Sequence, residues 1–317
     1  MNDKQPPTAS GRTNELHRSG RETRPSALSK SVDAGDESGL INDVADTAFW
    51  TAGIRAREQK RQLPAYLDAY SEHLAGAKGL QIARRLQGAT EIDWGVSMRS
   101  VTIDRMILGA LSQGVDVIIN LGAGLDARPY RLDIPPHVLW VEADLPEIIE
   151  YKNARTAGDT PRCIVRRVAA DLTSVQSLGG VLSLIADGER KALVLTEGVL
   201  PYLTAEEVAA IAGDLHGAPN VISWVVEYDA AGAHGWAPGY RKALRAVPRR
   251  FQMPHLLSFL RFSGWEPEEQ VGSGEEAARL GRPIPVGFPR RLLWRMLPAH
   301  WRDQIENLSG VALLRKT

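Results

Sequence analysis

From residue 115 onward, short apolar runs alternate with amphipathic stretches, and this alternation constrains the fold more than any other feature. Five runs have the length and apolar content of buried strands: 115–121, 137–144, 163–171, 191–197 and 220–229. Three stretches between them carry apolar residues at helical spacing: 145–155, 174–187 and 204–216. Strands that alternate with helices in this way form a parallel sheet with helices on both of its faces.

Two later segments complete the predicted sheet. Residues 264–272 and 310–317 each have the length and composition of a closing strand. Thr204, with Glu207 three residues later, has the signature of a capping box, which indicates that a helix begins there. We therefore predict an α/β fold, a Rossmann-like, doubly wound sheet of seven strands with an N-terminal helical extension.

The rest of the chain differs in composition from this alternating region. Residues 1–40 are mostly Ser, Thr, Asn, Gly, Pro and charged residues. They bury too little apolar surface to offset the entropy of ordering, so we predict a disordered tail. Residues 41–317 are predicted to form one domain, in which 41–113 are a helical N-terminal cap. Residues 230–260 interrupt the alternation with Gly, Pro, Arg and aromatic residues, and we interpret them as a lid.

Charge and cysteine content exclude several classes of protein. The 38 basic and 38 acidic residues cancel, so no overall field favours a nucleic acid or an anionic membrane as partner. Cys163 is the only cysteine, and no His, Cys and acidic residues are spaced as metal ligands. No apolar run approaches the roughly 20 residues that span a bilayer, and no secretory signal is present. We expect a cytoplasmic protein without a metal; the sequence says nothing of its oligomeric state.

The stretch VIINLGAGLDARPYRL, residues 117–132, joins a predicted buried strand to a glycine turn. Gly122 and Gly124 lack a Cβ atom, so the chain can turn tightly there and a ligand can approach the backbone. With Ala127 they form a G-x-G-x-x-A pattern, and Asp144 follows Gly124 by 20 residues. This pattern fits a dinucleotide and S-adenosylmethionine equally well.

Asp126, inside the turn, favours S-adenosylmethionine over a dinucleotide. A pyrophosphate at the start of the next helix would lie beside this carboxylate, so two negative charges would be adjacent. S-adenosylmethionine has no phosphate and carries a sulfonium, an ammonium and a carboxylate. The alternative is that Asp126 only caps the next helix.

Three more acidic residues stand at the carboxyl ends of successive predicted strands. Asp144 ends the second strand, where a carboxylate can accept hydrogen bonds from both ribose hydroxyls. Asp171, followed by Leu172, ends the third strand, within reach of the adenine amino group. Glu197 ends the fourth strand, near the expected amino-acid part of the ligand. Glu142 shares a strand face with Asp144 and is the alternative ribose ligand.

Several motifs together resemble the leucine carboxyl methyltransferase family of S-adenosylmethionine-dependent enzymes. They are DTAFWTAGIRARE, GVSMRSVTIDRMI, NLGAGLDARPYRL, WVEADLPEIIEYK and LTEGVLPYLTAEEV. The resemblance covers residues 43–230 and continues more weakly into FLRFSGWEPEE. Ala69 stands where this family usually has a proline, in a loop. Bacterial members of the family include carboxyl and hydroxyl methyltransferases of natural-product pathways.

The resemblance implies a role for each matching position in binding S-adenosylmethionine. Arg99 would clamp the methionine carboxylate and Asp144 would hold the ribose. Asp171 with Leu172 would border the adenine, and Glu197 would lie near the ammonium and the sulfonium. The implied cofactor-binding residues are Arg99, Gly122, Ala123, Gly124, Asp126, Asp144, Asp171, Leu172 and Glu197. The resemblance also implies that Arg55 assists at the cofactor entrance.

The expected activity is O-methyl transfer to a small-molecule acceptor, with a carboxylate favoured and a hydroxyl of a natural product as the other option. A carboxylate is already nucleophilic at neutral pH, whereas a hydroxyl needs a general base. The sequence identifies no catalytic residue. Candidates for contacts with the acceptor are Tyr228 and His234, and Trp224, Trp236 and Trp265 are candidates for its pocket.

Two other functions remain open from the sequence. One is an NAD(P)-dependent oxidoreductase on the same Rossmann fold, which the acidic residues at 126, 171 and 197 disfavour. The other is a non-catalytic protein that binds S-adenosylmethionine without turning it over.

Overall fold

The computed structural model describes residues 41–86, 90–186, 189–229, 247, 250–251, 256–288 and 290–317. The predicted tail over 1–40 and most of the predicted lid over 230–260, including His234 and Trp236, lie outside these residues.

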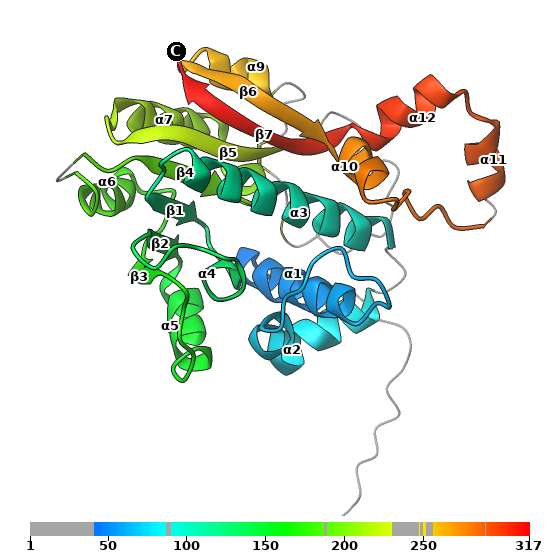
Figure 1. Ribbon diagram of the computed structural model, residues 1–317, viewed down its shortest axis with the longest axis horizontal. Coiled ribbons are helices and arrows are strands. Elements are labelled where there is room, and N and C mark those ends of the chain that lie inside the picture. Colours follow the sequence, from blue (N-terminus) through cyan, green and yellow to red (C-terminus); the bar gives the residue numbers. More distant parts are fainter. Residues whose placement is uncertain are drawn as a thin grey trace, which may run out of the picture. The chain divides into compact units, whose positions relative to one another are not determined.

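Seven strands form one sheet in the order β3-β2-β1-β4-β5-β7-β6 (Figure 1). The first five are parallel to one another, and β7 runs antiparallel between β5 and β6. The strands are β1 Val117–Leu121, β2 Leu139–Asp144, β3 Ile164–Ala169, β4 Ala192–Thr196, β5 Val221–Asp229, β6 Trp265–Gly272 and β7 Ser309–Lys316. The prediction of an α/β, doubly wound, seven-stranded sheet is confirmed, with each strand close to its predicted bounds.

The strand order reverses between β1 and β4, the central pair of the parallel region. Chain connections leave these two strands toward opposite sides, so a crevice forms beyond their carboxyl ends. The glycine turn follows β1 directly and therefore lies at this crevice.

Helices cover both faces of the sheet. The helices are α1 Val44–Gln59, α2 Ser71–Arg85, α3 Thr90–Ser112, α4 Arg128–Arg131, α5 Pro146–Arg155, α6 Val175–Ser183, α7 Ala205–Gly217, α9 Leu256–Arg261, α10 Ser273–Arg279, α11 Arg290–Met296 and α12 Ala299–Glu306. Neighbouring strand residues point to opposite faces. Ile118 accordingly joins a core with Ile107 of α3, whereas Ile119 joins a core with Leu178 of α6 and Val208 of α7.

Local sequence explains where α7 begins. Thr204 is its N-cap and accepts a hydrogen bond from the Glu207 N–H, while the Glu207 carboxylate accepts one from the Thr204 N–H. Both donors belong to the first turn, where a helix cannot satisfy them internally. The predicted capping box is therefore confirmed.

The N-terminal helices α1 and α2 lie side by side (Figure 1). Their contact depends on two glycines: a Cβ atom on Gly79 would lie 2.4 Å from the Phe49 carbonyl oxygen, and one on Gly53 would lie 2.3 Å from the Gly79 carbonyl oxygen. Trp50, Ile54 and other apolar residues of α1 are buried in the same cluster. Close packing fixes the position of α1, which carries Arg55.

Trp224 and Trp265 lie in the sheet core rather than in an acceptor pocket. Their rings pack edge to face with centroids 5.5 Å apart, and both side chains are fully buried. Trp224 Nε1 donates to the Thr196 hydroxyl, and Trp265 Nε1 donates to the Ala212 carbonyl. The expectation that these two residues line the acceptor pocket is therefore wrong; an amphipathic indole with its N–H paired internally fills the core well.

Candidate functional site

A cavity of about 520 Å³ lies at the carboxyl ends of the parallel strands, beside the switch point between β1 and β4. Its walls come from the segments that follow β1, β2, β3 and β4, and from α1 and α3. All nine residues predicted to bind the cofactor line this cavity: Arg99, Gly122, Ala123, Gly124, Asp126, Asp144, Asp171, Leu172 and Glu197. Arg55 lines it too. The volume is within the range of about 300–1,000 Å³ that is usual for small-molecule sites.

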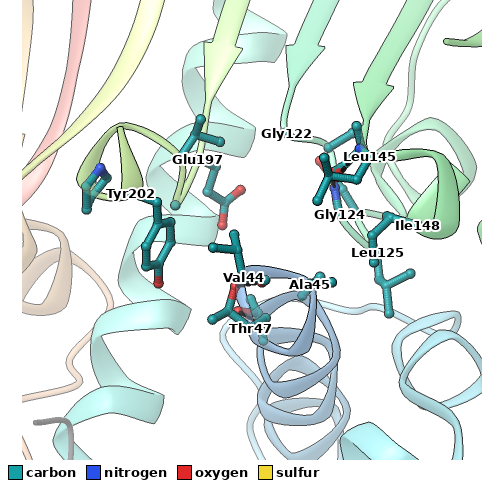
Figure 2. A pocket seen from close by; sticks show the side chains of 18 of the residues that line it. Val44, Ala45, Thr47, Gly122, Gly124, Leu125, Leu145, Ile148, Glu197 and Tyr202 are labelled. Carbon is teal, nitrogen blue, oxygen red and sulfur yellow. Dashed lines mark hydrogen bonds between the residues drawn. The ribbon is translucent and has the colours of Figure 1, made fainter. Parts of the chain in front are cut away.

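The glycine turn brings bare backbone to the cavity. Gly122 and Gly124 have φ angles of +66° and +49°, a left-handed conformation that residues with a Cβ atom rarely adopt. A Cβ atom on Gly122 would also lie 2.3 Å from a methyl carbon of Val199. Figure 2 shows this turn and Glu197 on one side of the cavity, with Thr47 of α1 facing them. The backbone conformation at both positions and the close approach of Val199 at Gly122 therefore explain the two glycines of this turn.

Asp144 is held by the backbone at the rim of the turn. Its Oδ2 accepts a hydrogen bond from the Gly124 N–H at 2.6 Å, and its Oδ1 accepts one from the Leu145 N–H at 2.7 Å. Burial raises the pKa of this carboxyl above its ordinary value, although both N–H groups act to lower it. Each oxygen keeps a further lone pair for a ligand hydroxyl.

Asp171 differs from Asp144 in being exposed. Its Oδ1 accepts hydrogen bonds from the N–H and the hydroxyl of Thr173, which fixes the loop after β3. The neighbouring Leu172 is half-buried against the core. The pair therefore offers one polar and one apolar group at the edge of the cavity.

Glu197 is the centre of a buried ion-pair network. Its Oε1 accepts hydrogen bonds from Arg55 Nη2 at 2.8 Å and from Arg99 Nε at 2.9 Å. Its Oε2 accepts one from Arg128 Nη1 at 2.7 Å. Burial alone would raise the pKa of Glu197, but the three guanidiniums lower it well below its ordinary range. Glu197 is therefore ionised, and it orients three arginines.

Sequence reasoning missed Glu227 on β5. Its carboxylate accepts a hydrogen bond from Arg99 Nη1 at 2.5 Å, so Arg99 lies between Glu227 and Glu197. Glu227 lines the cavity, and its side chain is largely buried. A carboxylate that directly follows the apolar residues of β5 is the signal that could have indicated it.

Asp126 does not face the cavity as an uncompensated charge. It accepts hydrogen bonds from Arg128 Nη1 at 2.7 Å, from the Arg128 N–H at 2.9 Å and from Asn120 Nδ2 at 2.9 Å. One of these donors is the N–H of Arg128, the first residue of α4, but the N-cap of that helix is Ala127 and the helix has no side-chain cap hydrogen bond, so the alternative that Asp126 caps it is not confirmed. Because Arg128 neutralises it, the argument that Asp126 by itself repels a pyrophosphate loses its force. Asn120 and Arg128 were also missed by sequence reasoning.

The cavity as a whole, however, has an excess of acidic side chains. Its described lining includes the carboxylates of Asp43, Asp126, Asp144, Asp171, Glu197 and Glu227, and the guanidiniums of Arg55, Arg99 and Arg250. Together with Arg128, whose guanidinium binds two of these carboxylates, the balance is six negative and four positive charges, and this excess of two negative charges favours a cationic ligand over an anionic one. The preference for S-adenosylmethionine over a dinucleotide, which the sequence assigned to Asp126, therefore comes from the lining as a whole.

Glu142, the alternative ribose ligand, is unavailable for that role. It is fully buried, and its carboxylate accepts hydrogen bonds from Lys152 Nζ and Arg167 Nε, both at 2.7 Å. It does not belong to the described lining of the cavity. Between the two acidic residues of β2, only Asp144 lies at the site.

Tyr228 lies on β5 but outside the lining that the described residues form. Its register partner is Gly310 of β7, and a Cβ atom on that glycine would lie 2.4 Å from the Tyr228 hydroxyl. The structure therefore places Tyr228 against β7 and does not support its predicted contact with the acceptor.

The described residues offer neither a metal site nor a membrane-spanning helix. They contain no cluster of three or more His, Cys, Asp and Glu side chains that could hold a metal ion. None of the helices they form has both the length and the apolar character needed to cross a membrane.

The chain matches a known family over more than half of its length. The sequence model of the family described as "Leucine carboxyl methyltransferase" matches residues 48–215, which is more than half of the chain. This match begins in α1 and ends in α7, so it includes every segment that forms the glycine turn and the Glu197 network.

Two curated relatives carry the name "Putative S-adenosyl-L-methionine-dependent methyltransferase". The one from Frankia alni is 30% identical over 271 residues, which are 80% of this chain and 94% of that protein. The one from Mycolicibacterium gilvum is 28% identical over 285 residues, which are 78% of this chain and 89% of that protein. A crystal structure described as a "putative methyltransferase" from Thermobifida fusca has a TM-score of 0.53 and 17% identity, covering 89% of this chain and 97% of that one.

Proposed function

Because the chain belongs to the leucine carboxyl methyltransferase family, we propose that it transfers a methyl group from S-adenosylmethionine to an oxygen atom of a small-molecule acceptor. The acceptor oxygen that we favour is a carboxylate, so the product would be a methyl ester. The observation that carries this proposal is the cavity at the switch point of the sheet. Its lining is acidic, its arginines are paired with carboxylates, and it includes all nine predicted residues.

The residues of the cavity fit the parts of S-adenosylmethionine. Asp144 has two oxygens oriented by backbone N–H groups, which suits the two ribose hydroxyls. Asp171 and Leu172 suit the amino group and the ring of adenine. Arg99 is held by Glu197 and Glu227 and can donate to the methionine carboxylate. The excess of carboxylates suits a cationic sulfonium and counts against the pyrophosphate of NAD(P).

S-adenosylmethionine supplies an electrophilic methyl group that needs no further activation. The protein therefore has to align the acceptor with that group and exclude water. Apolar side chains of α1 and α3 contribute to this exclusion: Trp50, Ile54, Ile92 and Val96 line the cavity. They would also contact an apolar portion of the acceptor.

The side chains that line the described part of the cavity favour a carboxylate acceptor, because none of them is a His, Cys or Lys that could act as a general base. Of the carboxylates, Glu197 and Glu227 are paired with arginine and Asp43 caps α1, while Asp144 and Asp171 are assigned to the cofactor. Carboxylates held in this way are weak bases. A carboxylate acceptor is ionised at neutral pH and needs none, whereas a phenol or an alcohol does.

Calorimetric titration with S-adenosylmethionine, S-adenosylhomocysteine, NADH and NADPH tests the cofactor. We expect binding of the two sulfur ligands alone, and binding of a dinucleotide alone would overturn the proposal. Incubation with labelled S-adenosylmethionine and panels of carboxylic acids and phenols then tests the acceptor. Mild alkali releases labelled methanol from a methyl ester but not from an aryl ether, so alkali-stable product would show that the acceptor is a hydroxyl.

A further inference from the structure

The connection between β6 and β7 is much longer than two neighbouring strands require. β6 ends at Gly272 and β7 begins at Ser309, and antiparallel neighbours can be joined by a two-residue hairpin. Here residues 273–308 join them, and this connection forms α10, α11 and α12 outside the sheet (Figure 1). We call its outer part, residues 288–302, the arm. Long connections often carry a function of their own.

The arm starts and ends on a tightly packed base. A Cβ atom on Gly274 of α10 would lie 2.5 Å from the Glu306 Cβ atom at the end of α12. Arg282, which precedes the arm, donates to both carboxylate oxygens of Glu58 in α1. The Arg282 carbonyl oxygen accepts a hydrogen bond from Trp94 Nε1 of α3 at 2.8 Å. The exposed arm is therefore a built element that is fixed to the body of the protein.

Five large apolar side chains of the arm are exposed to solvent. Their exposed fractions are 53–90%, and they belong to Phe288, Leu292, Leu293, Met296 and Trp301. Successive residues of an α-helix are about 100° apart around its axis, so Leu292, Leu293 and Met296 lie on one side of α11. Trp294 lies on the other side and is half-buried. Single exposed apolar residues are ordinary, whereas a cluster of them marks a docking surface.

The arm is also strongly basic. Residues 277–302 contain six arginines and no acidic residue, although the whole chain has 38 basic and 38 acidic residues. Two of the six, Arg279 and Arg282, pair with glutamates at the base. The other four belong to the arm: Arg290, Arg291, Arg295 and Arg302. The neutral balance of the whole chain, which predicts no membrane partner, therefore hides a local positive charge.

Charge identifies the partner that suits this surface. In a symmetrical dimer the same patch of both copies would meet, so arginines would face arginines. An anionic lipid bilayer has the complementary charge, and each arginine near such a surface adds to the attraction. Arginine together with exposed Leu, Phe and Trp is also the composition of helices that lie in the interface of a membrane. Charge and apolar exposure therefore both favour a bilayer over a second copy.

We propose that the arm docks the protein on an anionic lipid bilayer. Leu292, Leu293 and Met296 enter the boundary between head groups and acyl chains, and the arginines contact lipid phosphates. Such binding requires no spanning helix, and the described residues contain none. The inference goes beyond the proposed function and does not depend on it, since no residue of the arm belongs to the described lining of the cavity.

Co-sedimentation with vesicles tests this inference. We expect the protein to sediment with vesicles made of equal parts of phosphatidylcholine and phosphatidylglycerol, and not with vesicles of phosphatidylcholine alone. Added salt should weaken the binding, because it screens the attraction between the arginines and the anionic lipids. Equal sedimentation with both kinds of vesicle, or with neither, would overturn the inference.

A pair of leucine substitutions tests the apolar contact. Leu292→Ser combined with Leu293→Ser should weaken vesicle binding by at least about tenfold, because two leucine side chains no longer leave water on binding. Leu63→Ser combined with Leu67→Ser is the matched control. Both of these leucines are also strongly exposed, but they lie between α1 and α2. The control should bind vesicles as the wild type does.

Arg295→Glu tests the charge independently of the leucines. Arg295 is exposed on α11, and reversing its charge should weaken vesicle binding by about tenfold or more. Arg166→Glu, at an exposed position of β3, changes the net charge of the chain by the same amount and is the matched control. It should bind vesicles nearly as the wild type does. Thermal unfolding checks that each variant is folded.

The variants also separate a bilayer from a second copy. If the wild type is a dimer by sedimentation equilibrium, and the Leu292→Ser, Leu293→Ser variant is a monomer that binds vesicles as the wild type does, the arm is an interface between copies and the inference is wrong. Equal losses of vesicle binding in both leucine pairs would mean that another surface meets the bilayer, which also overturns it. If the leucine variant does not fold, Arg295→Glu decides: unchanged vesicle binding would refute the inference.

Discussion

At the scale of single residues, the site depends on carboxylates whose surroundings give them different tasks. Glu142 and Asp144 stand two positions apart on β2, yet one is sealed in the interior with Lys152 and Arg167 and the other opens to the cavity. Glu197 and Asp126 hold arginines in place. Only Asp144 has both oxygens fixed by backbone N–H groups, so its orientation is independent of other side chains.

Asp144→Ala is expected to weaken the binding of S-adenosylhomocysteine by at least about tenfold. If Asp144 holds the ribose as proposed, the variant lacks two hydrogen bonds from ribose hydroxyls to a carboxylate, each worth about 1.5 kcal/mol or more. Calorimetry measures the loss. Asp133→Ala is a matched control, because Asp133 is fully exposed and lies outside the cavity lining. Wild-type affinity in Asp144→Ala would refute the ribose assignment.

Arg99→Ala should impair S-adenosylhomocysteine more than adenosine. Adenosine has no carboxylate, so it cannot use the guanidinium that Glu197 and Glu227 orient. The expected loss for S-adenosylhomocysteine is about tenfold or more, as for a charged hydrogen bond, while adenosine should bind nearly as before. Competition between the two ligands measures this ratio directly. Equal losses for both ligands would show that Arg99 acts on the shape of the cavity and not on the carboxylate.

At the scale of secondary-structure elements, the close contact of α1 with α2 determines where Arg55 lies. Gly79→Ala would place a methyl group 2.4 Å from the Phe49 carbonyl oxygen, so the helices would have to separate. Overpacking of this kind costs about 1–3 kcal/mol. Denaturant unfolding should show that loss, and S-adenosylhomocysteine should bind more weakly as Arg55 moves with α1.

Gly109→Ala is the matched control for this substitution. Gly109 also lies inside a helix, α3, but a Cβ atom there would meet nothing within 4 Å. Alanine is the better helix former by up to about 1 kcal/mol, so this variant should be as stable as the wild type or more so. If Gly79→Ala is as stable as Gly109→Ala, the contact between α1 and α2 is not tight.

The elements were predictable from the sequence to the extent that they follow local patterns. The strands, the glycine turn and the capping box at Thr204 depend on neighbouring residues, and each lies where it was predicted. The partners of the site residues depend on contacts between distant segments. Arg55 meets Glu197 across 142 positions and Arg99 meets Glu227 across 128, and no local pattern encodes such a pairing. This is why Glu227 was overlooked.

At the scale of the whole molecule, Asp93 makes the stability depend on pH. It lies in the first turn of α3 and pairs with Arg57 of α1 at 3.1 Å. Burial raises its pKa from 3.8 to about 6, with Glu58 adding to the rise, while Arg57 and Arg61 act to lower it. The folded protein therefore holds a proton on Asp93 more tightly than the unfolded chain does.

The stabilisation that comes from this proton is complete below about pH 4 and is lost as the pH rises through 6. A rise of the pKa from 3.8 to about 6 corresponds to about 3 kcal/mol. Asp93→Asn has no proton to lose, so its free energy of unfolding, relative to the wild type, should rise by about this amount between pH 4 and pH 7. Urea unfolding at a series of pH values gives the free energy of unfolding of both proteins. The titration of all other groups contributes equally to the two values, so it cancels in their difference. If the free energies of unfolding of the wild type and of Asp93→Asn change in parallel with pH, Asp93 is ionised throughout this range, and Arg57 fully compensates the cost of its burial.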